Sequence, residues 1–112
     1  MNIKLPLDQD KKLNVIFRLE AGCLGPQGTE HIDAFCQSAQ KMVKETDTEF
    51  IVWTIVPRHD KTLPEIEYRI NNKKLNHEKA VKYLNIFSKN LDEFEANLQD
   101  KLALYIDDYL GQ

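Results

Sequence analysis

Seven consecutive uncharged residues, Phe50 to Val56, constrain the fold of this chain more than any other feature. The run is rich in β-branched and aromatic residues, which favour strands, and Pro57 ends it. A strand that is apolar on both faces needs cover on both. We therefore expect residues 50–56 to form the central strand of a sheet and the other segments to surround it.

An alternating segment and a helical segment precede this strand. From Leu13 to Glu20, apolar and polar residues alternate with the period of a strand. Thr29 is the expected N-cap of a helix that ends near Thr46, because apolar residues then recur every three or four positions: Ile32, Phe35, Cys36, Ala39, Met42 and Val43. Strand, helix and strand in succession predict a crossover unit with parallel strands.

Two further strands are suggested by shorter alternations. Residues 66–70 alternate, and we expect them to pair antiparallel with the central strand across a long hairpin loop. Near the N-terminus, Ile3, Leu5 and Leu7 alternate around Pro6, which fits either a short edge strand or a frayed arm.

The C-terminal third is helical, and two interpretations of it stay open. Asn76 is the expected N-cap, and the apolar residues keep one helical phase as far as Tyr109. A single helix from His77 to Leu110 would be about 50 Å long, too long for a domain of this size. Asn90 with Glu93 matches a capping box, which favours two helices with a restart at Asn90.

The fold class that follows is α+β, in one domain spanning residues 1–112. We expect a small mixed sheet of three or four strands, in the order strand, helix, strand, strand, helix, with a long or broken C-terminal helix. No apolar segment is long enough for a secretory signal or a membrane span, and two cysteines are too few for a disulfide framework. We expect a cytoplasmic protein without a membrane association.

The charge is unevenly distributed. The net charge is −3, yet residues 89–112 carry two basic and six acidic side chains, a charge of −4, which leaves +1 for the rest. A dominant basic field is absent, so nucleic-acid binding is disfavoured. Residues 58–82 have seven basic and four acidic side chains, and they would support RNA binding only if a sheet face displayed aromatic rings, for which Tyr68 is the candidate.

One end of the sheet is a candidate binding site. The loops after two parallel strands lie at the same end, which also holds the N-terminus of the first helix, where anions bind. We expect six residues of loops 20–31 and 58–61 to converge there: Cys23, Gly25, Gly28, His31, Arg58 and His59. A thiol beside a helix N-terminus loses its proton more easily, so Cys23 is a candidate reactive cysteine. This cluster supports a small-ligand or anion-binding function, but no motif predicts a metal site, a cofactor or a reaction.

The C-terminal helix supports a different function. Its apolar stripe is wider than one sheet face requires, because Ala96, Ala103, Leu104, Ile106 and Leu110 add to it. The favoured function is therefore a small protein-interaction module that self-associates as a homodimer, with an interface at Leu98, Leu102, Tyr105 and Tyr109. Under this hypothesis Leu98→Asp with Leu102→Asp dissociates the dimer and leaves the chain folded.

Overall fold

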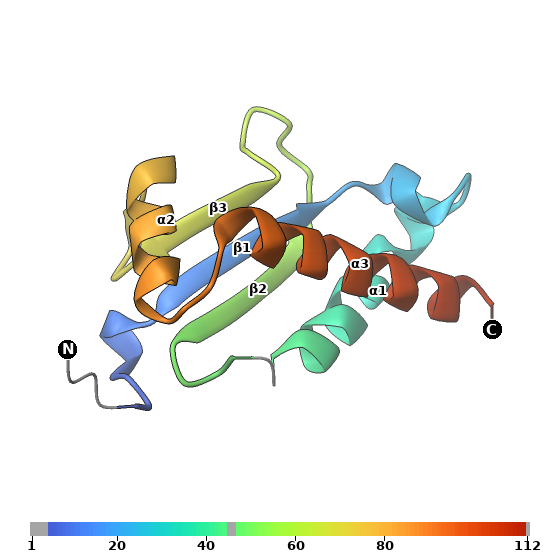
Figure 1. Cartoon of the computed structure of the whole chain (residues 1–112). Helices are drawn as coiled ribbons and strands as arrows, with labels where there is room; N and C mark the ends of the chain where they lie inside the picture. Colours follow the sequence, from blue (N-terminus) through green and yellow to red (C-terminus); the bar gives the residue numbers. More distant parts are fainter. Residues whose placement is uncertain (1–4, 45–46, 112) are drawn as a thin grey trace.

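The computed structural model describes residues 5–44 and 47–111, which form a four-stranded mixed sheet with three α-helices (Figure 1). The strands are β1 (Leu13–Leu19), β2 (Ile51–Pro57), β3 (Ile66–Ile70) and β4 (Lys73–Lys74). The helices are α1 (Gly28–Val43), α2 (His77–Ile86) and α3 (Leu91–Leu110), with short 3₁₀ helices η1 (Gln9–Lys11) and η2 (Ala21–Leu24). The predicted α+β class and mixed sheet are confirmed. In the part of the chain that is described, no helix is both long and apolar enough to cross a membrane.

The centre of the sheet is β1, so the prediction that residues 50–56 form the central strand is wrong. The strand order is β2-β1-β3-β4, with β2 parallel and β3 antiparallel to β1. Residues 66–70 form the expected strand, but its partner is β1 and no hairpin joins it to β2. The predicted crossover of strand, helix and parallel strand is confirmed.

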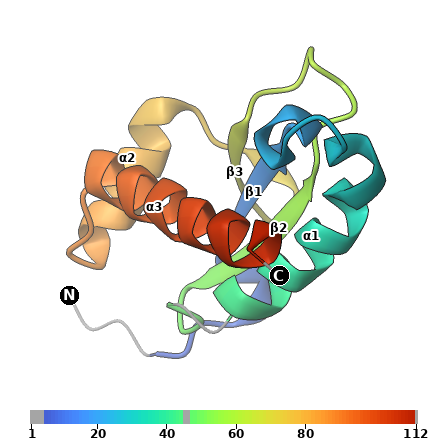
Figure 2. The ribbon, with the colours of Figure 1, turned by 90° about the vertical axis from the view of Figure 1, so that its right-hand side faces the viewer.

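The position of α1 explains why an outer strand is so apolar. The Gln40 side chain of α1 donates a hydrogen bond to the Trp53 carbonyl oxygen at 2.7 Å and accepts one from the Ile55 N–H at 2.7 Å. These backbone groups lie on the outer edge of β2, which α1 therefore covers (Figure 2). A covered edge tolerates the same apolar residues as a central strand.

One face of the sheet carries the core. Alternate residues of β1 and β2 are buried, and α2 and α3 lie over them (Figure 2). Trp53 is buried in the core and stacks on Phe94 of α3 with ring centroids 5.5 Å apart. Tyr68 is also buried there, and its hydroxyl donates a hydrogen bond to Glu95 at 2.7 Å. The prediction of Tyr68 as an exposed aromatic ring is therefore wrong.

The break in the C-terminal helix is confirmed. The Lys89 N–H donates to the Leu84 carbonyl oxygen at 2.9 Å across Ser88, which has a φ of 61°. This is a Schellman ending, in which a left-handed residue closes the helix. The Asn90 side chain then accepts a hydrogen bond from the Glu93 N–H, and Asn76 caps α2 in the same way, as predicted.

Three predicted boundaries differ from the structure. Helix α1 begins at Gly28 after Gln27, so Thr29 is not its N-cap. A Cβ at Gly28 would lie 1.7 Å from the Ala21 carbonyl oxygen, so a close backbone approach fixes this start. Helix α1 ends at Val43, and the predicted end near Thr46 lies outside the described residues. Ile3 of the predicted first strand is also outside them, while Leu5 and Leu7 belong to no strand.

Candidate interaction surface

The two loops predicted to be neighbours are neighbours. The Arg58 N–H donates to the Leu19 carbonyl oxygen at 2.8 Å, and its guanidinium pairs with the Glu20 carboxylate at 2.8 Å. Both contacts follow from the parallel pairing of β1 with β2, which places the ends of the two strands side by side. The end of the sheet is thus built as expected.

The six predicted binding residues do not line one cavity there. A cavity of about 110 Å³ contains Arg58 and His59 in its lining, together with residues of β1, β2 and α1. Cys23, Gly25, Gly28 and His31 are not part of that lining. Ligand pockets usually enclose about 300 to 1,000 Å³, so this cavity is small for an organic ligand. Ligand binding at this end stays a prediction.

Three of the other predicted binding residues have contacts or conformations that belong to the fold itself. The His31 Nδ1 lies 3.2 Å from the Tyr109 hydroxyl, and the two rings meet edge to face at 5.8 Å. Gly25 has a φ of +88°, a conformation that favours glycine, and Gly28 permits the close approach to Ala21. The glycine loop therefore has a conformational explanation that needs no ligand.

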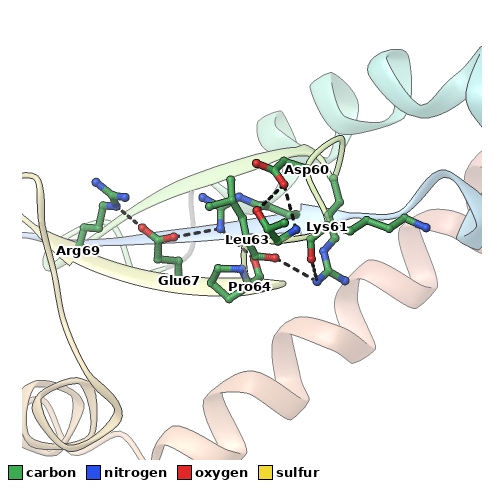
Figure 3. A network of polar contacts seen from close by, with 9 residues as sticks. Asp60, Lys61, Leu63, Pro64, Glu67 and Arg69 are labelled. Carbon is green, nitrogen blue, oxygen red and sulfur yellow. Dashed lines mark hydrogen bonds and ion pairs between the residues drawn. The ribbon is translucent and has the colours of Figure 1, made fainter.

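The loop from Arg58 to Leu63 is held by its own hydrogen bonds (Figure 3). Arg58 donates to the carbonyl oxygens of Lys61 and Leu63, the latter at 3.0 Å. The Asp60 carboxylate accepts from the Thr62 hydroxyl at 2.6 Å and from its N–H at 2.9 Å, and these bonds lower the pKa of Asp60. The Arg58 guanidinium is committed to this loop and to Glu20.

The cysteines differ in their surroundings. Cys23 is exposed and Cys36 is buried, and both are free thiols. Burial, and secondarily the nearby Asp33 carboxylate, raises the pKa of Cys36 to about 11, so this thiol stays protonated and unreactive. Over residues 5–44 and 47–111, no three side chains of the histidine, cysteine, aspartate and glutamate types are grouped so that they could hold a metal ion.

The residues of the predicted interface on α3 differ in exposure. Leu98 and Leu102 are each only 2% exposed and pack in the core of the single chain, which argues against them as the main contact residues, and self-association stays a prediction. Tyr105 and Tyr109 are partly buried, and Tyr109 contacts Phe35 edge to face at 5.5 Å. The apolar side chains that α3 exposes are instead Leu104 and Leu110, at 63% and 50%.

The second face of the sheet is the largest surface of the strands that the chain leaves without a helix. We call it the bare face, and define it by the strand residues that alternate with the core residues: Asn14, Ile16, Arg18, Val52, Thr54, Val56, Glu67, Arg69 and Lys74. Among the described residues, α2 and α3 lie on the opposite side of the sheet and α1 runs along β2 (Figures 1 and 2). The side chains of β1 and β2 on this face are half-buried, as expected for a sheet surface without cover.

A buried carboxylate organises one side of the bare face (Figure 3). Glu67 is 2% exposed and pairs with Arg18 at 3.1 Å and with Arg69. Arg18 also donates to the Pro64 carbonyl oxygen at 2.9 Å. Burial tends to raise the pKa of Glu67, but the hydrogen bonds from Arg69 and Arg18 outweigh it, so the pKa lies below its usual value. Glu67 is therefore ionised at neutral pH.

The composition of the bare face resembles that of a protein interface. Ile16, Val52 and Val56 are apolar, and the paired charges of β3 lie beside them. Interfaces between proteins combine an apolar centre with a polar rim in the same way. The bare face contains no aromatic residue, since Phe17, Trp53 and Tyr68 all point to the core, so it lacks the exposed aromatic rings on which RNA bases commonly stack.

Sequence reasoning missed this surface although its signal was present. The alternation in residues 13–20 was used to identify a strand and to find its core residues. Its polar half, Asn14 and Arg18, marks a face that helices do not cover, as Glu67 and Arg69 do in β3. These polar residues of β1 and β3 form one surface because the two strands are neighbours, which the expected central position of residues 50–56 does not predict.

Searches of protein-family models, of curated proteins and of solved structures found nothing that matches this chain.

Proposed function

We propose that the protein is an interaction module that binds another polypeptide through its bare face. The observation that carries this proposal is the alternation of buried and half-buried residues along β1 and β2, with α2 and α3 over one face and α1 along the outer edge of β2 in the described part of the chain. A half-apolar sheet surface without a helix is a site that a partner can cover. The free state of both cysteines supports a reducing, cytoplasmic location for this function.

The edges of the sheet are closed to a partner strand. Gln40 occupies the backbone groups of Trp53 and Ile55 on the outer edge of β2. At the other edge, β4 has only two residues, and both are exposed lysines. Short edge strands and lysines on them prevent the addition of a further strand. A partner must therefore pack on the bare face itself.

The size of the bare face suits one helix. Three strands about 4.8 Å apart, of which β1 and β2 have seven residues and β3 has five, give a surface of roughly 10 by 20 Å. A helix with its side chains is about 10 Å wide, so one helix of about four turns would cover this area. A standard interface buries about 800 Å² on each partner, so a contact limited to the bare face is weak and reversible.

Site-specific photo-cross-linking tests the proposal. A photoreactive amino acid at Val52 on the bare face should give a discrete adduct of higher mass in an extract of the cells that make the protein. The matched control carries the same group at Lys82, which is exposed on α2. Adducts from both positions with equal yield, or from neither, would contradict the proposed function.

A further inference from the structure

We propose that the partner of the bare face is a second copy of this chain, which contributes the outer side of α3. This inference rests on the proposed function and names the occupant. Within residues 5–44 and 47–111, two surfaces lack a covering element, the bare face and the outer side of α3, and their net charges are opposite in sign.

The outer side of α3 is acidic with exposed apolar side chains beside the acids. Glu93, Asp100 and Asp107 follow one another at intervals of seven residues, so they form one line along the helix away from the core. Leu104, 63% exposed, lies next to this line and borders a groove of about 500 Å³ whose lining includes Trp53 and Phe94. Helix α3 has six acidic residues and one basic residue, a net charge of −5.

The bare face has the opposite charge. Arg18, Arg69 and Lys74 contribute three positive charges and Glu67 one negative charge, a net charge of +2. Opposite net charges on two surfaces accelerate their encounter and fix their orientation. The apolar part of the bare face, Ile16 with Val52 and Val56, would then cover Leu104.

The two surfaces lie on opposite sides of the molecule, because α3 covers the core face of the sheet (Figure 2). A reciprocal twofold dimer is therefore excluded for this contact. Each copy instead adds its helix layer to the sheet of the next copy, which completes the helix, sheet, helix layering common in mixed folds. Such a head-to-tail contact does not close at two copies, so it forms open chains that grow with concentration, or rings of three or more copies where the rotation between copies closes.

The purified protein gives the first readout. We expect the average mass measured by light scattering to rise steadily between about 10 µM and 1 mM, the range of weak contacts, and to pass the mass of two chains without a plateau. Raising the salt to about 1 M should return the mass toward that of one chain, because exposed charges are then screened.

Two variants with complementary losses provide the decisive test. Asp100→Lys with Asp107→Lys removes the acidic helix surface but keeps the bare face. Val52→Asp with Lys74→Glu removes the basic apolar surface but keeps α3. Each variant alone should stay monomeric, whereas an equimolar mixture should form a species of two chains and no larger one. A variant that failed to fold could not restore association in the mixture.

Control variants carry similar charge changes elsewhere on the surface. Asp8→Lys with Asp10→Lys alters exposed residues of the N-terminal segment, and Leu63→Asp alters the exposed loop before β3. Both should assemble like the unchanged protein. The inference is overturned if the unchanged protein stays monomeric, if its mass stops at two chains, or if the mixture of variants does not associate. If it stays monomeric while cross-linking at Val52 captures a different protein in the extract, the proposed function stands and this inference fails.

Discussion

The two faces of the sheet show how the same strands serve two purposes. Phe17 is 4% exposed in the core, whereas its neighbours Ile16 and Arg18 lie half-buried on the bare face. The core face concentrates the aromatic rings and receives α2 and α3, while the bare face combines branched apolar residues with paired charges. The core face therefore buries most of the apolar side chains of the sheet, and the bare face is the surface that we propose for contacts with a partner.

The bare face needs its own means of stabilisation, since no helix covers it. Glu67 and Arg18 are almost completely removed from water there, and a buried charge is tolerated only when it is paired and hydrogen-bonded. The two arginines around Glu67 and the loop carbonyl of Pro64 supply those partners. Paired charges therefore help to stabilise the bare face, as apolar burial stabilises the core face.

The largest expected effect comes from charges placed in the core. Leu98→Asp with Leu102→Asp would bury two carboxylates without partners, which costs several kcal/mol each and exceeds the stability of a typical domain of about 5 to 15 kcal/mol. We expect the variant to lack a cooperative thermal transition in circular dichroism. A folded monomer would instead return these leucines to the interface predicted from the sequence.

The sequence predicts the elements of this fold better than their arrangement. Alternation located β1 and β3, the apolar stripe located α1, and Asn90 with Glu93 located the restart of α3. These signals are local, because they depend on the period of one element and on its caps. The order of the strands in the sheet depends on contacts between distant segments, which no local pattern predicts. Because α1 covers the outer edge of β2, this edge strand can have the apolar composition of a central strand.

The candidate site was less predictable for the same reason. The parallel pairing of β1 with β2 correctly predicted that the segments of Glu20 and Arg58 are neighbours. It did not predict that His31 contacts Tyr109 or that Gly28 lies against Ala21, because these contacts depend on the packing of other segments. On α3, the phase of the stripe identified Leu98 and Leu102 as equivalent apolar residues without showing that the chain itself covers them. The side that stays exposed depends on the packing of the whole molecule.

An intermediate effect is expected for Glu67→Gln. The amide cannot replace the carboxylate between Arg18 and Arg69, and removing one partner of a buried ion pair costs about 3 kcal/mol. Urea denaturation at pH 7 measures this loss, with the exposed Glu65→Gln as a control expected to change the free energy of unfolding by less than about 0.5 kcal/mol.

The pH dependence of the same variant tests the cause. Because the folded-state pKa of Glu67 is lowered, its ionised form stabilises the protein fully above the unfolded pKa of about 4.3, and this contribution disappears as the pH falls through the lower folded value. The difference in the free energy of unfolding between the unchanged protein and Glu67→Gln should therefore shrink below about pH 4. A loss of stability that is the same at pH 7 and pH 3 would show that packing and not charge explains the effect.

The smallest effect is expected for an aspartate that replaces an apolar residue on the bare face. Val52→Asp leaves the carboxylate in contact with water, so it should cost only about 1 kcal/mol through lost strand propensity and lost apolar burial, and Val52→Thr about half of that. Thermal melts at about 5 µM protein measure the stability of Val52→Asp and Val52→Thr and compare it with that of the variant that carries Leu98→Asp with Leu102→Asp. A large loss of stability at Val52 would mean that this face is already covered in dilute solution, and hence that the partner contact is strong and permanent. A small loss there, beside complete unfolding of the leucine variant, would establish that apolar burial stabilises the single chain on the core face and contributes little at Val52 on the bare face.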